Sequence, residues 1–349
     1  MKAWVLHNVN DIQLEDVPMP EVGENEVLVK VKAAGICGSD IPRIYTSGAY
    51  FYPLITGHEF SGQVESVGKN VDSKWQGKRV GIFPLIPCRE CVPCKNKQFE
   101  MCKKYSYLGS RRNGGFAEYV AVPERNLIEL PDNVSFEEAA MLEPMAVAVH
   151  AIRRVEPKIN DTVVVCGLGT IGMLIVMFLA EMGIKKILVV GNKDFQRETV
   201  IKLGVAEDNF CDLRITDVDK WLTEKTNSNG ADVFFECVGK NETINQAVNN
   251  TAAGGKVMLV GNPYGDVAFD KNTYWKILRN QLIVTGSWNS SFTEDETDDW
   301  HYVIGKLTDE KVHPAELISH RFGMDELEKG LHIMRDKSEG FLKVMMKLD

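Results

Sequence analysis

The stretch that decides the fold of this sequence is residues 163–172, which read VVVCGLGTIG. The three valines are typical of a short buried strand, and the apolar run after the glycines is typical of a helix. Between them the spacing is G-x-G-x-x-G. Gly167 permits a tight turn, Gly169 lets a ligand approach the backbone, and Gly172 lets the helix pack on the strand. In this context the turn predicts a site for the pyrophosphate of a dinucleotide.

The helix after the turn would begin at Thr170 and Ile171, whose backbone N–H groups have no partner within a first helical turn and can face phosphates. Further apolar strands follow near residues 186–190, 233–235 and 257–260, with helical spacing between them. Strand and helix in alternation predict an α/β fold with a doubly wound parallel sheet.

The end of the second strand of this region bears on the choice of cofactor, because an acid there normally binds the adenosine ribose. Here the strand ends in Gly191, Asn192 and Lys193. Because Gly191 has no carboxylate, nothing at this position would repel a 2′-phosphate. Asn192 and Lys193 could bind such a phosphate. The sequence therefore favours NADP(H). In the alternative, Lys193 is a solvated lysine and Asp194 serves the ribose of NAD(H).

The sequence on either side of this region has a different pattern. About 150 residues before it alternate as β-strands do, for example in 27–31 and 62–68, with frequent Gly and Pro. After residue 287 the chain is polar and acidic, and an amphipathic helix follows near residues 324–335. This tail is too short for a core of its own. We therefore expect it to return and complete the first, β-rich domain.

Four cysteines give the most specific signal in the chain. They follow the pattern C-x-x-C-x-x-C-x7-C, at Cys88, Cys91, Cys94 and Cys102. Thiolates two residues apart in a turn can converge on one tetrahedral zinc, and the fourth closes the shell. A zinc with four thiolate ligands has no open position and would be structural. An iron–sulfur cluster and four free thiols remain alternatives, since spacing alone does not exclude them.

A second set of residues suits a catalytic zinc, which needs three protein ligands and one open position. Cys37 and His58 are candidate ligands, and Glu143 is the candidate third ligand. Pro144 should restrict the backbone of Glu143 to extended forms. Each residue also has a plainer interpretation: a core cysteine, a locally hydrogen-bonded histidine and a carboxylate on a helix face.

Composition narrows the class of protein. The 349 residues carry a net charge of −9, which disfavours nucleic acid as a partner. The apolar run 163–180 is interrupted by glycines, so we interpret it as a buried strand, turn and helix and expect no membrane partner. From its charged and polar residues we expect no signal peptide at the start of the sequence. Cysteines crowded for metal binding indicate a reducing compartment, so we expect a cytoplasmic protein.

Taken together, these residues resemble the zinc-containing medium-chain dehydrogenase/reductase family. The likeness includes residues 57–59 (GHE), the four-cysteine lobe, residues 114–119 (GGFAEY) and the glycine turn. Residues 142–144 (LEP) resemble the polyol dehydrogenase branch, which has Glu where alcohol dehydrogenases have Cys. Residues 37–44, 48–53, 109–115 and 286–288 are similar to the galactitol-1-phosphate 5-dehydrogenases within that branch. Those enzymes use NAD, and the stretch Gly191–Lys193 departs from their pattern.

The resemblance implies a GroES-like β catalytic domain with a zinc lobe (1–152), a Rossmann dinucleotide-binding domain (153–287) and a return segment that completes the catalytic domain (288–349). Members of the family are homodimers or homotetramers, commonly joined through edge strands of the Rossmann sheet. Residues 281–285 (QLIVT) are the apolar candidate for that edge.

The resemblance also implies a mechanism with two Zn²⁺ per chain, one catalytic and one structural. A secondary alcohol would bind the catalytic zinc and pass its hydride to the nicotinamide. Ser39 would carry the alcohol proton outward, and Asp40 would orient His58. Glu59 would be an alternative ligand or a gate for water exchange. Two other classes remain open: a quinone reductase-like enzyme without catalytic zinc, and a noncatalytic cofactor-binding protein.

The expected substrate is a polyol phosphate of the galactitol-1-phosphate type, converted to a keto-sugar phosphate. Arginine is suited to phosphate because its planar fork donates two hydrogen bonds at once. The candidates for the phosphate are Arg43, Arg111 and Arg112, and Tyr50 and Tyr52 could bind the hydroxyls between. An unphosphorylated polyol such as sorbitol, or another secondary alcohol, needs no arginine and is the alternative.

Overall fold

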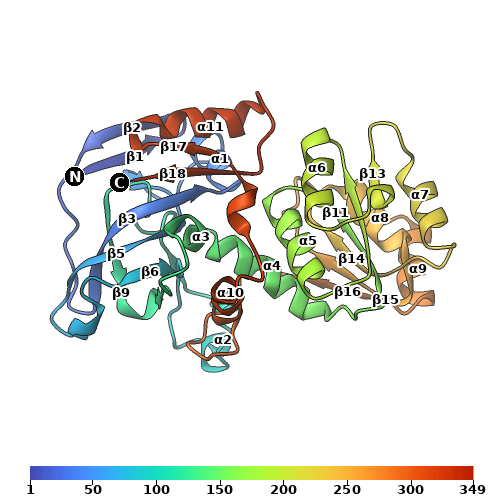
Figure 1. The fold of residues 1–349 in the computed structure, drawn as a ribbon, viewed down its shortest axis with the longest axis horizontal. Coiled ribbons are helices and arrows are strands. Elements are labelled where there is room, and N and C mark those ends of the chain that lie inside the picture. The colour runs from blue at the N-terminus through green and yellow to red at the C-terminus, as the bar shows by residue number, and fades with distance from the viewer. Residues whose placement is uncertain (349) are drawn as a thin grey trace. The chain divides into compact units, whose positions relative to one another are not determined.

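The computed structural model describes residues 1–348 and divides the chain into two compact units (Figure 1). The first unit contains Met1–Glu143 together with the residues from Ser291 onward, and the second contains Pro144–Ser290. The first boundary between the units falls inside helix α4 (Leu142–Val155), and the second falls after Ser290. The sequence predicted these two domain boundaries at residues 153 and 288.

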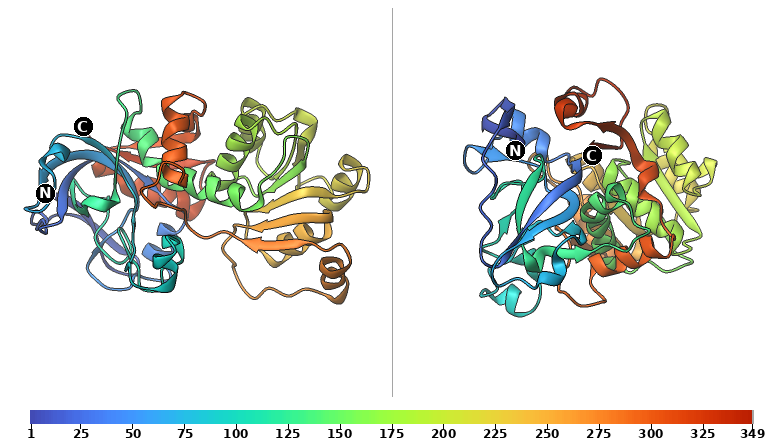
Figure 2. Two further views of the ribbon diagram at one scale, coloured as in Figure 1. Left: turned by 90° about the horizontal axis from the view of Figure 1, so that it is seen from below. Right: turned by 60° about the vertical axis from the view of Figure 1, so that its left-hand side comes forward.

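The first unit is built on a seven-stranded sheet with the order β10-β6-β5-β3-β18-β17, in which β9 also pairs with β3. Its central strand β3 buries Val27, Val29 and Val31 completely. The two C-terminal strands extend this sheet, because β18 pairs antiparallel with β3 (Figure 2). The strands are β3 (Glu26–Ile36), β5 (Glu59–Val67), β6 (Arg79–Ile82), β9 (Tyr119–Pro123), β10 (Leu127–Glu129), β17 (Ile318–Phe322) and β18 (Lys343–Lys347).

Smaller elements of the first unit surround this sheet. Helix α3 is fixed at its start by a capping box between Ser135 and Glu138. Helix α11 buries Leu327, Leu331 and Met334, which is the amphipathic pattern expected near residues 324–335. The remaining strands are β1 (Lys2–Asn8), β2 (Asp11–Asp16), β4 (Leu54–Ile55), β7 (Leu85–Ile86) and β8 (Ser106–Tyr107). The helices are α1 (Asp40–Tyr45), α2 (Val92–Lys95), α3 (Phe136–Ala140), α10 (Asp299–Thr308) and α11 (Leu327–Asp336).

The second unit contains a six-stranded, wholly parallel sheet with the order β13-β12-β11-β14-β15-β16. The order reverses at β11, as in a doubly wound fold, and the α/β expectation is confirmed. Its strands are β11 (Thr162–Cys166), β12 (Lys186–Gly191), β13 (Phe210–Asp212), β14 (Ala231–Glu236), β15 (Thr251–Leu259) and β16 (Ile283–Gly286). Its helices are α5 (Thr170–Glu181), α6 (Asp194–Lys202), α7 (Val218–Lys225), α8 (Asn241–Asn249) and α9 (Lys271–Arg279), after most of α4.

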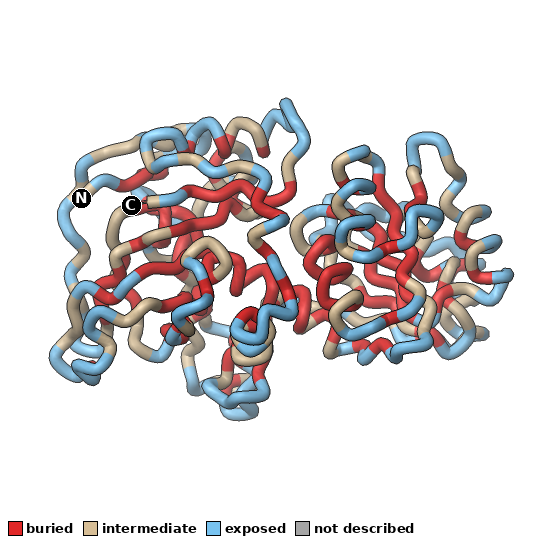
Figure 3. Tube along the Cα trace, in the orientation of Figure 1, coloured by how far each residue is buried: buried red, intermediate tan, exposed pale blue. Residues whose placement is uncertain are grey.

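Burial follows these elements in each unit, with buried stretches along the strands and exposed stretches in the loops (Figure 3). Helix α5 is buried from Gly172 to Leu179, which explains the apolar run in the sequence. Within residues 1–348, no helix is both long enough and apolar enough to cross a membrane.

Candidate functional site

The four cysteines of the lobe converge in the first unit. Cys91 Sγ lies 3.4 Å from Cys94 Sγ and 3.9 Å from Cys102 Sγ, and Cys88 Sγ lies 3.9 Å from Cys94 Sγ. Disulfide sulfurs would be about 2 Å apart, and all four thiols are free. Thiolates arranged tetrahedrally around zinc at about 2.3 Å are about 3.8 Å apart. The set therefore fits one tetrahedral ion.

The surroundings of the lobe favour thiolates and hold the loop in place. Backbone N–H groups of Lys103 and Cys94 lower the pKa of the Cys91 thiol to about 6. Two ion pairs join the lobe to the segment before α10: Lys97 Nζ lies 2.9 Å from Asp295 Oδ2, and Arg89 Nη2 lies 3.1 Å from Glu294 Oε1. The four-cysteine lobe can thus anchor Glu294 and Asp295 of the C-terminal return segment.

A second group of possible metal ligands contains Cys37, His58 and Glu59. Their ligand atoms all lie within 4.8 Å of one another. Cys37 directly follows β3, and Glu59 begins β5, which pairs with β3 so that Gly35 faces Glu59. A Cβ at Gly35 would collide with Glu59 Oε2, so glycine makes room for the carboxylate. Thiolate, imidazole and carboxylate form a donor set that suits zinc.

Asp40 supports this group from behind. Its carboxylate is fully buried, accepts the backbone N–H of Cys37 at 3.0 Å and lies 3.4 Å from His58 Nδ1. His58 Nε2 is then the ring nitrogen left for a metal. Arg43 Nη1 donates to Asp40 at 2.8 Å. Burial opposes ionisation of Asp40, yet His58 and Arg43 hold its pKa below the ordinary value. Ser39 Oγ donates to Cys37 Sγ at 3.4 Å.

Lys343 is a member of the site that the sequence reasoning missed. Its Nζ donates to Glu59 Oε2 and, at 3.2 Å, to the carbonyl oxygen of Ile36. Burial lowers the pKa of Lys343, but Glu59 and Cys37 outweigh it and the net shift is upward. A single lysine within the apolar run 341–346 was the available signal, because a charge on a buried strand needs a partner.

Glu143 lies beside the same group but is not one of its three members. It is buried, and its Oε1 accepts a hydrogen bond of 3.1 Å from Tyr107 Oη. Burial raises the pKa of Glu143 to about 7, and Glu59 adds to the rise. Tyr107 is another residue that the sequence reasoning missed. Its ring meets the ring of His58 edge-on, with centroids 5.7 Å apart.

The expected extended backbone at Glu143 is wrong, because Glu143 lies in the first turn of α4. Pro144 fits there because a first-turn residue needs no N–H partner. The preference of a residue before proline for extended forms is outweighed by the helix that follows.

The three candidate arginines have different partners. Arg112 Nη2 pairs with Glu26 at 2.7 Å, and Arg43 pairs with Asp40 as described. The guanidinium of Arg111 lies over the rings of Tyr50 and Tyr105, 4.4 Å from each centroid. It also donates to Tyr50 Oη at 3.3 Å. No carboxylate within residues 1–348 is paired with Arg111.

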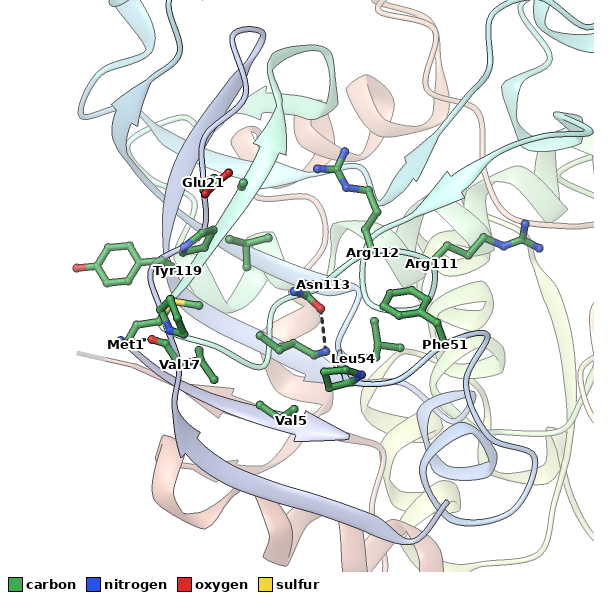
Figure 4. A pocket seen from close by; sticks show the side chains of 16 residues that line it. Met1, Val5, Val17, Glu21, Phe51, Leu54, Arg111, Arg112, Asn113 and Tyr119 are labelled. Atoms are coloured by element: carbon green, nitrogen blue, oxygen red, sulfur yellow. Dashed lines mark hydrogen bonds between the residues drawn. The ribbon is translucent and has the colours of Figure 1, made fainter. Parts of the chain in front are cut away.

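Figure 4 shows where this loop lies relative to a pocket of about 540 Å³ in the first unit. Arg111 and Arg112 stand at its border and extend in different directions, and Asn113 Oδ1 accepts the backbone N–H of Ile55 at 3.1 Å. Of the described residues that line the pocket, none belongs to the Cys37 group. Tyr50 is largely exposed, and Tyr52 Oη accepts the N–H of Ala49.

In the second unit, the glycine turn has the geometry that its spacing predicts. Gly167 has a φ of +97°, a conformation that favours glycine. A Cβ at Gly172 would collide with the carbonyl oxygen of Gly167. Gly169 is the N-cap of α5, which begins with Thr170 and Ile171. The N-terminus of this helix therefore lies at the glycine turn, the position at which parallel α/β folds bind phosphate groups.

The end of β12 is tightly packed. A Cβ at Gly191 would lie 2.9 Å from Leu168 Cδ1 and 3.0 Å from Gln196 Oε1. Gln196 accepts the N–H of Asn192 at 3.1 Å and donates to the carbonyl oxygen of Leu168 at 2.9 Å. It thereby ties the glycine turn to α6, which the sequence did not reveal. Lys193 Nζ lies 5.3 Å from the ring centroid of Phe195.

Comparisons with known proteins agree with this geometry. Residues 23–132 match the family model described as alcohol dehydrogenase GroES-like domain, and residues 170–308 match zinc-binding dehydrogenase. The chain is 32% identical to galactitol 1-phosphate 5-dehydrogenase of Escherichia coli K12 over 92% of each protein. It is 33% identical to sorbitol dehydrogenase of Bacillus subtilis over 75% of each.

Solved structures give the same result. Galactitol-1-phosphate dehydrogenase from Escherichia coli superposes with a TM-score of 0.92 at 30% identity, covering all of both chains. A zinc-binding dehydrogenase from Sinorhizobium meliloti 1021 bound to NADP gives 0.90 at 28% identity over 99% of each chain. A short chain alcohol dehydrogenase from E. coli CFT073 complexed with NADH gives 0.91 at 27% identity, covering 100% of this chain and 99% of that one.

Proposed function

Because the chain belongs to the zinc-dependent family of medium-chain alcohol and polyol dehydrogenases, we propose that it transfers a hydride between a polyol phosphate and a nicotinamide dinucleotide. The substrate is of the galactitol-1-phosphate type, and the product is a keto-sugar phosphate. The proposal of a phosphorylated substrate rests on Arg111. Its guanidinium lies over two tyrosine rings and is not paired with any described carboxylate.

The Cys37 group is the catalytic metal site in this proposal. Cys37 and His58 are two ligands, and the geometry supports Glu59 as the third. Glu143 lies beside this group, where its carboxylate accepts a hydrogen bond from Tyr107. A zinc ion held there supplies Lewis acidity that lowers the pKa of the substrate hydroxyl. Cys88, Cys91, Cys94 and Cys102 hold a second, structural zinc.

The chain's own residues prepare the site for proton and substrate. Asp40 fixes the ring of His58, and Lys343 fixes one oxygen of Glu59. Ser39, hydrogen-bonded to Cys37 Sγ, is positioned to receive the substrate hydroxyl proton and pass it outward.

Arg111 is the phosphate anchor, and Tyr50 and Tyr52 are the residues proposed for the intervening hydroxyls. Arg43 and Arg112 are less suited, because each already pairs with a carboxylate. An unphosphorylated polyol is the second candidate, supported by the 33% identity to a sorbitol dehydrogenase.

For the cofactor we propose NADP(H) as preferred and NAD(H) as accepted. Gly191 carries no acid, the ends of the Leu168 and Gln196 side chains crowd the place where a Cβ would lie, and Asn192 and Lys193 follow directly. Similar structures contain either NADP or NADH.

We further propose a homodimer or homotetramer formed through the second unit. Strand β16 is the edge of its sheet, and Ile283 on this strand is 53% exposed. Exposed Trp275, Leu278 and Trp288 add apolar surface in the same unit. The eight free cysteines support a reducing, cytoplasmic setting.

One screen tests the substrate. Zinc-loaded protein is assayed with galactitol 1-phosphate, galactitol and sorbitol, each with NADP and with NAD. We expect kcat/KM to be highest for the phosphorylated polyol with NADP. If sorbitol or galactitol is turned over at least as efficiently as every polyol phosphate, the phosphate proposal fails and the sorbitol-type function replaces it.

A further inference from the structure

Tyr107 joins the proposed catalytic site to the loop that carries Arg111. Its hydroxyl donates a hydrogen bond of 3.1 Å to Glu143 Oε1, and its ring lies edge-on to the ring of His58. Its backbone carbonyl oxygen accepts the N–H groups of Arg111 at 2.8 Å and Arg112 at 3.0 Å. One residue therefore contacts the surroundings of the metal site through its side chain and the proposed phosphate loop through its backbone.

The place of the Tyr107 ring is fixed from several sides. Strand β8, which ends with Tyr107, pairs with β7. The ring of Tyr105 meets the ring of Tyr107 edge-on, with centroids 6.1 Å apart, and Arg111 lies over the ring of Tyr105. The backbone of the loop is also in close contact with the metal-binding segment, because a Cβ at Gly109 would lie 2.4 Å from the carbonyl oxygen of Gly57. The hydroxyl is therefore held at one place.

Glu143 is a carboxylate that a metal ion could attract. Carboxylate oxygens are zinc ligands in proteins, yet Glu143 is outside the group formed by Cys37, His58 and Glu59. Its backbone is fixed in the first turn of α4, so only a change of side-chain rotamer could bring it into that group. The hydrogen bond from Tyr107 opposes such a change, because it holds Oε1 where it is.

We propose that Tyr107 is a positioning residue that keeps Glu143 beside the metal-binding group and out of it. The inference rests on the proposed zinc-dependent function and deepens it. With Tyr107 in place, Glu59 is the carboxylate ligand and one position stays open for the substrate hydroxyl, as a catalytic zinc requires. Without the hydroxyl of Tyr107, Glu143 takes that position and the ion is enclosed as in a structural site. The loop that carries Arg111 thus also keeps the metal accessible.

The test compares turnover with metal retention in the full-length, zinc-loaded protein. Tyr107→Phe removes the hydroxyl and keeps the ring beside His58. Turnover of galactitol 1-phosphate should fall about tenfold to a hundredfold in kcat, the usual effect of removing a residue that supports a metal site. Release of the catalytic zinc to excess EDTA should become about tenfold slower, because a further ligand must dissociate. The catalytic zinc is the phase of release that Cys37→Ser lacks.

Glu143→Gln separates positioning from folding. If Tyr107 acts through the carboxylate of Glu143, adding Tyr107→Phe to Glu143→Gln protein should change kcat and zinc release by no more than about twofold. A purely structural tyrosine would lower activity and speed up zinc release together, and would do so in both backgrounds. Either result, faster zinc release from Tyr107→Phe or equal effects with and without Glu143, would overturn the inference.

Tyr45→Phe is the matched control. It removes another buried hydroxyl of the first unit, to which no residue in the described part of the chain is hydrogen-bonded. This substitution should leave both kcat and zinc release unchanged. If the unmodified protein oxidises no polyol, the proposed function fails, whereas the comparison of zinc release in the same variants still decides the role of Tyr107.

Discussion

Lys343 donates a hydrogen bond to Glu59 although 284 residues separate them, and both side chains are only 2% exposed. Each charge would be costly to bury alone, so each is tolerated because of the other. The pair holds one oxygen of Glu59 beside Cys37 and His58. The geometry of the proposed catalytic metal site therefore depends on strand β18.

With no metal in the Cys37 group, Lys343→Met should destabilise the protein by about 3–5 kcal/mol, because it leaves the carboxylate of Glu59 buried without a counter-charge. Chemical unfolding measures this. Lys347→Met, on the same strand but at an exposed pair with Glu137, should cost less than about 1 kcal/mol. The double variant Lys343→Met/Glu59→Gln should recover part of the loss. Equal stability of Lys343→Met and the unmodified protein would contradict the role of the pair.

Two zinc ions per chain are expected, with unequal roles. Cys37→Ser should abolish turnover and leave the unfolding temperature nearly unchanged, whereas Cys91→Ser should lower the unfolding temperature because the lobe loses its metal. Metal analysis of each variant should give about one zinc per chain. One zinc or none in freshly purified, active, unmodified protein would disprove this.

Removing Arg111 should affect the phosphorylated substrate alone. Arg111→Ala should raise KM for the polyol phosphate about tenfold to a hundredfold and change kcat less, if phosphate is held equally in ground and transition states. Steady-state kinetics with galactitol 1-phosphate and galactitol separate these effects. Arg112→Ala, which breaks the pair with Glu26, is the control. A similar KM change with galactitol would show that Arg111 supports the loop and not the phosphate.

The pair of His301 and Asp298 predicts a pH dependence of stability. Asp298 caps α10 and hydrogen-bonds the ring of His301 at 2.9 Å, which raises the pKa of His301 above 6.5. The raised value means that the folded state favours the protonated ring. The stabilisation is complete below pH 6.5 and is lost as the pH rises through the folded-state pKa.

The measurement is the unfolding temperature of the unmodified protein and of His301→Gln between pH 5 and 9. The difference should be largest at the acid end and shrink with rising pH. The exposed His313→Gln serves as a control. A difference in unfolding temperature that grows toward alkaline pH would be opposite to the expected trend. It would show that protonation of His301 is not the cause.

Sequence was informative where the determinants are local. The strand, turn and helix around Gly167 follow from neighbouring residues, and the four-cysteine lobe lies within a short loop. Lys343 and Tyr107 were not predictable, because their partners lie on distant segments and nothing in their own neighbourhood names those partners. The extended backbone expected at Glu143 failed for a related reason: a local preference was outweighed by the helix that α4 forms.

The prediction of NADP(H) as the cofactor is also limited by contacts that local sequence does not reveal. The absence of an acid at Gly191 is visible in the sequence. That the side chains of Leu168 and Gln196 would have to shift to admit a Cβ there depends on how the glycine turn and α6 pack against β12. Gly191→Asp would therefore test packing at the end of β12 as well as cofactor choice.

The order of strands in the first sheet has a consequence for synthesis. Strand β18 lies between β3 and β17, so the part of β3 that pairs with it stays open until residues 343–347 have been synthesised. All strands of the second sheet, from β11 to β16, emerge consecutively and earlier. A nascent chain can therefore complete its cofactor-binding unit while the metal-binding unit waits for β18, and a stop codon placed before residue 343 would remove the partner of Glu59 without removing any strand of the second sheet.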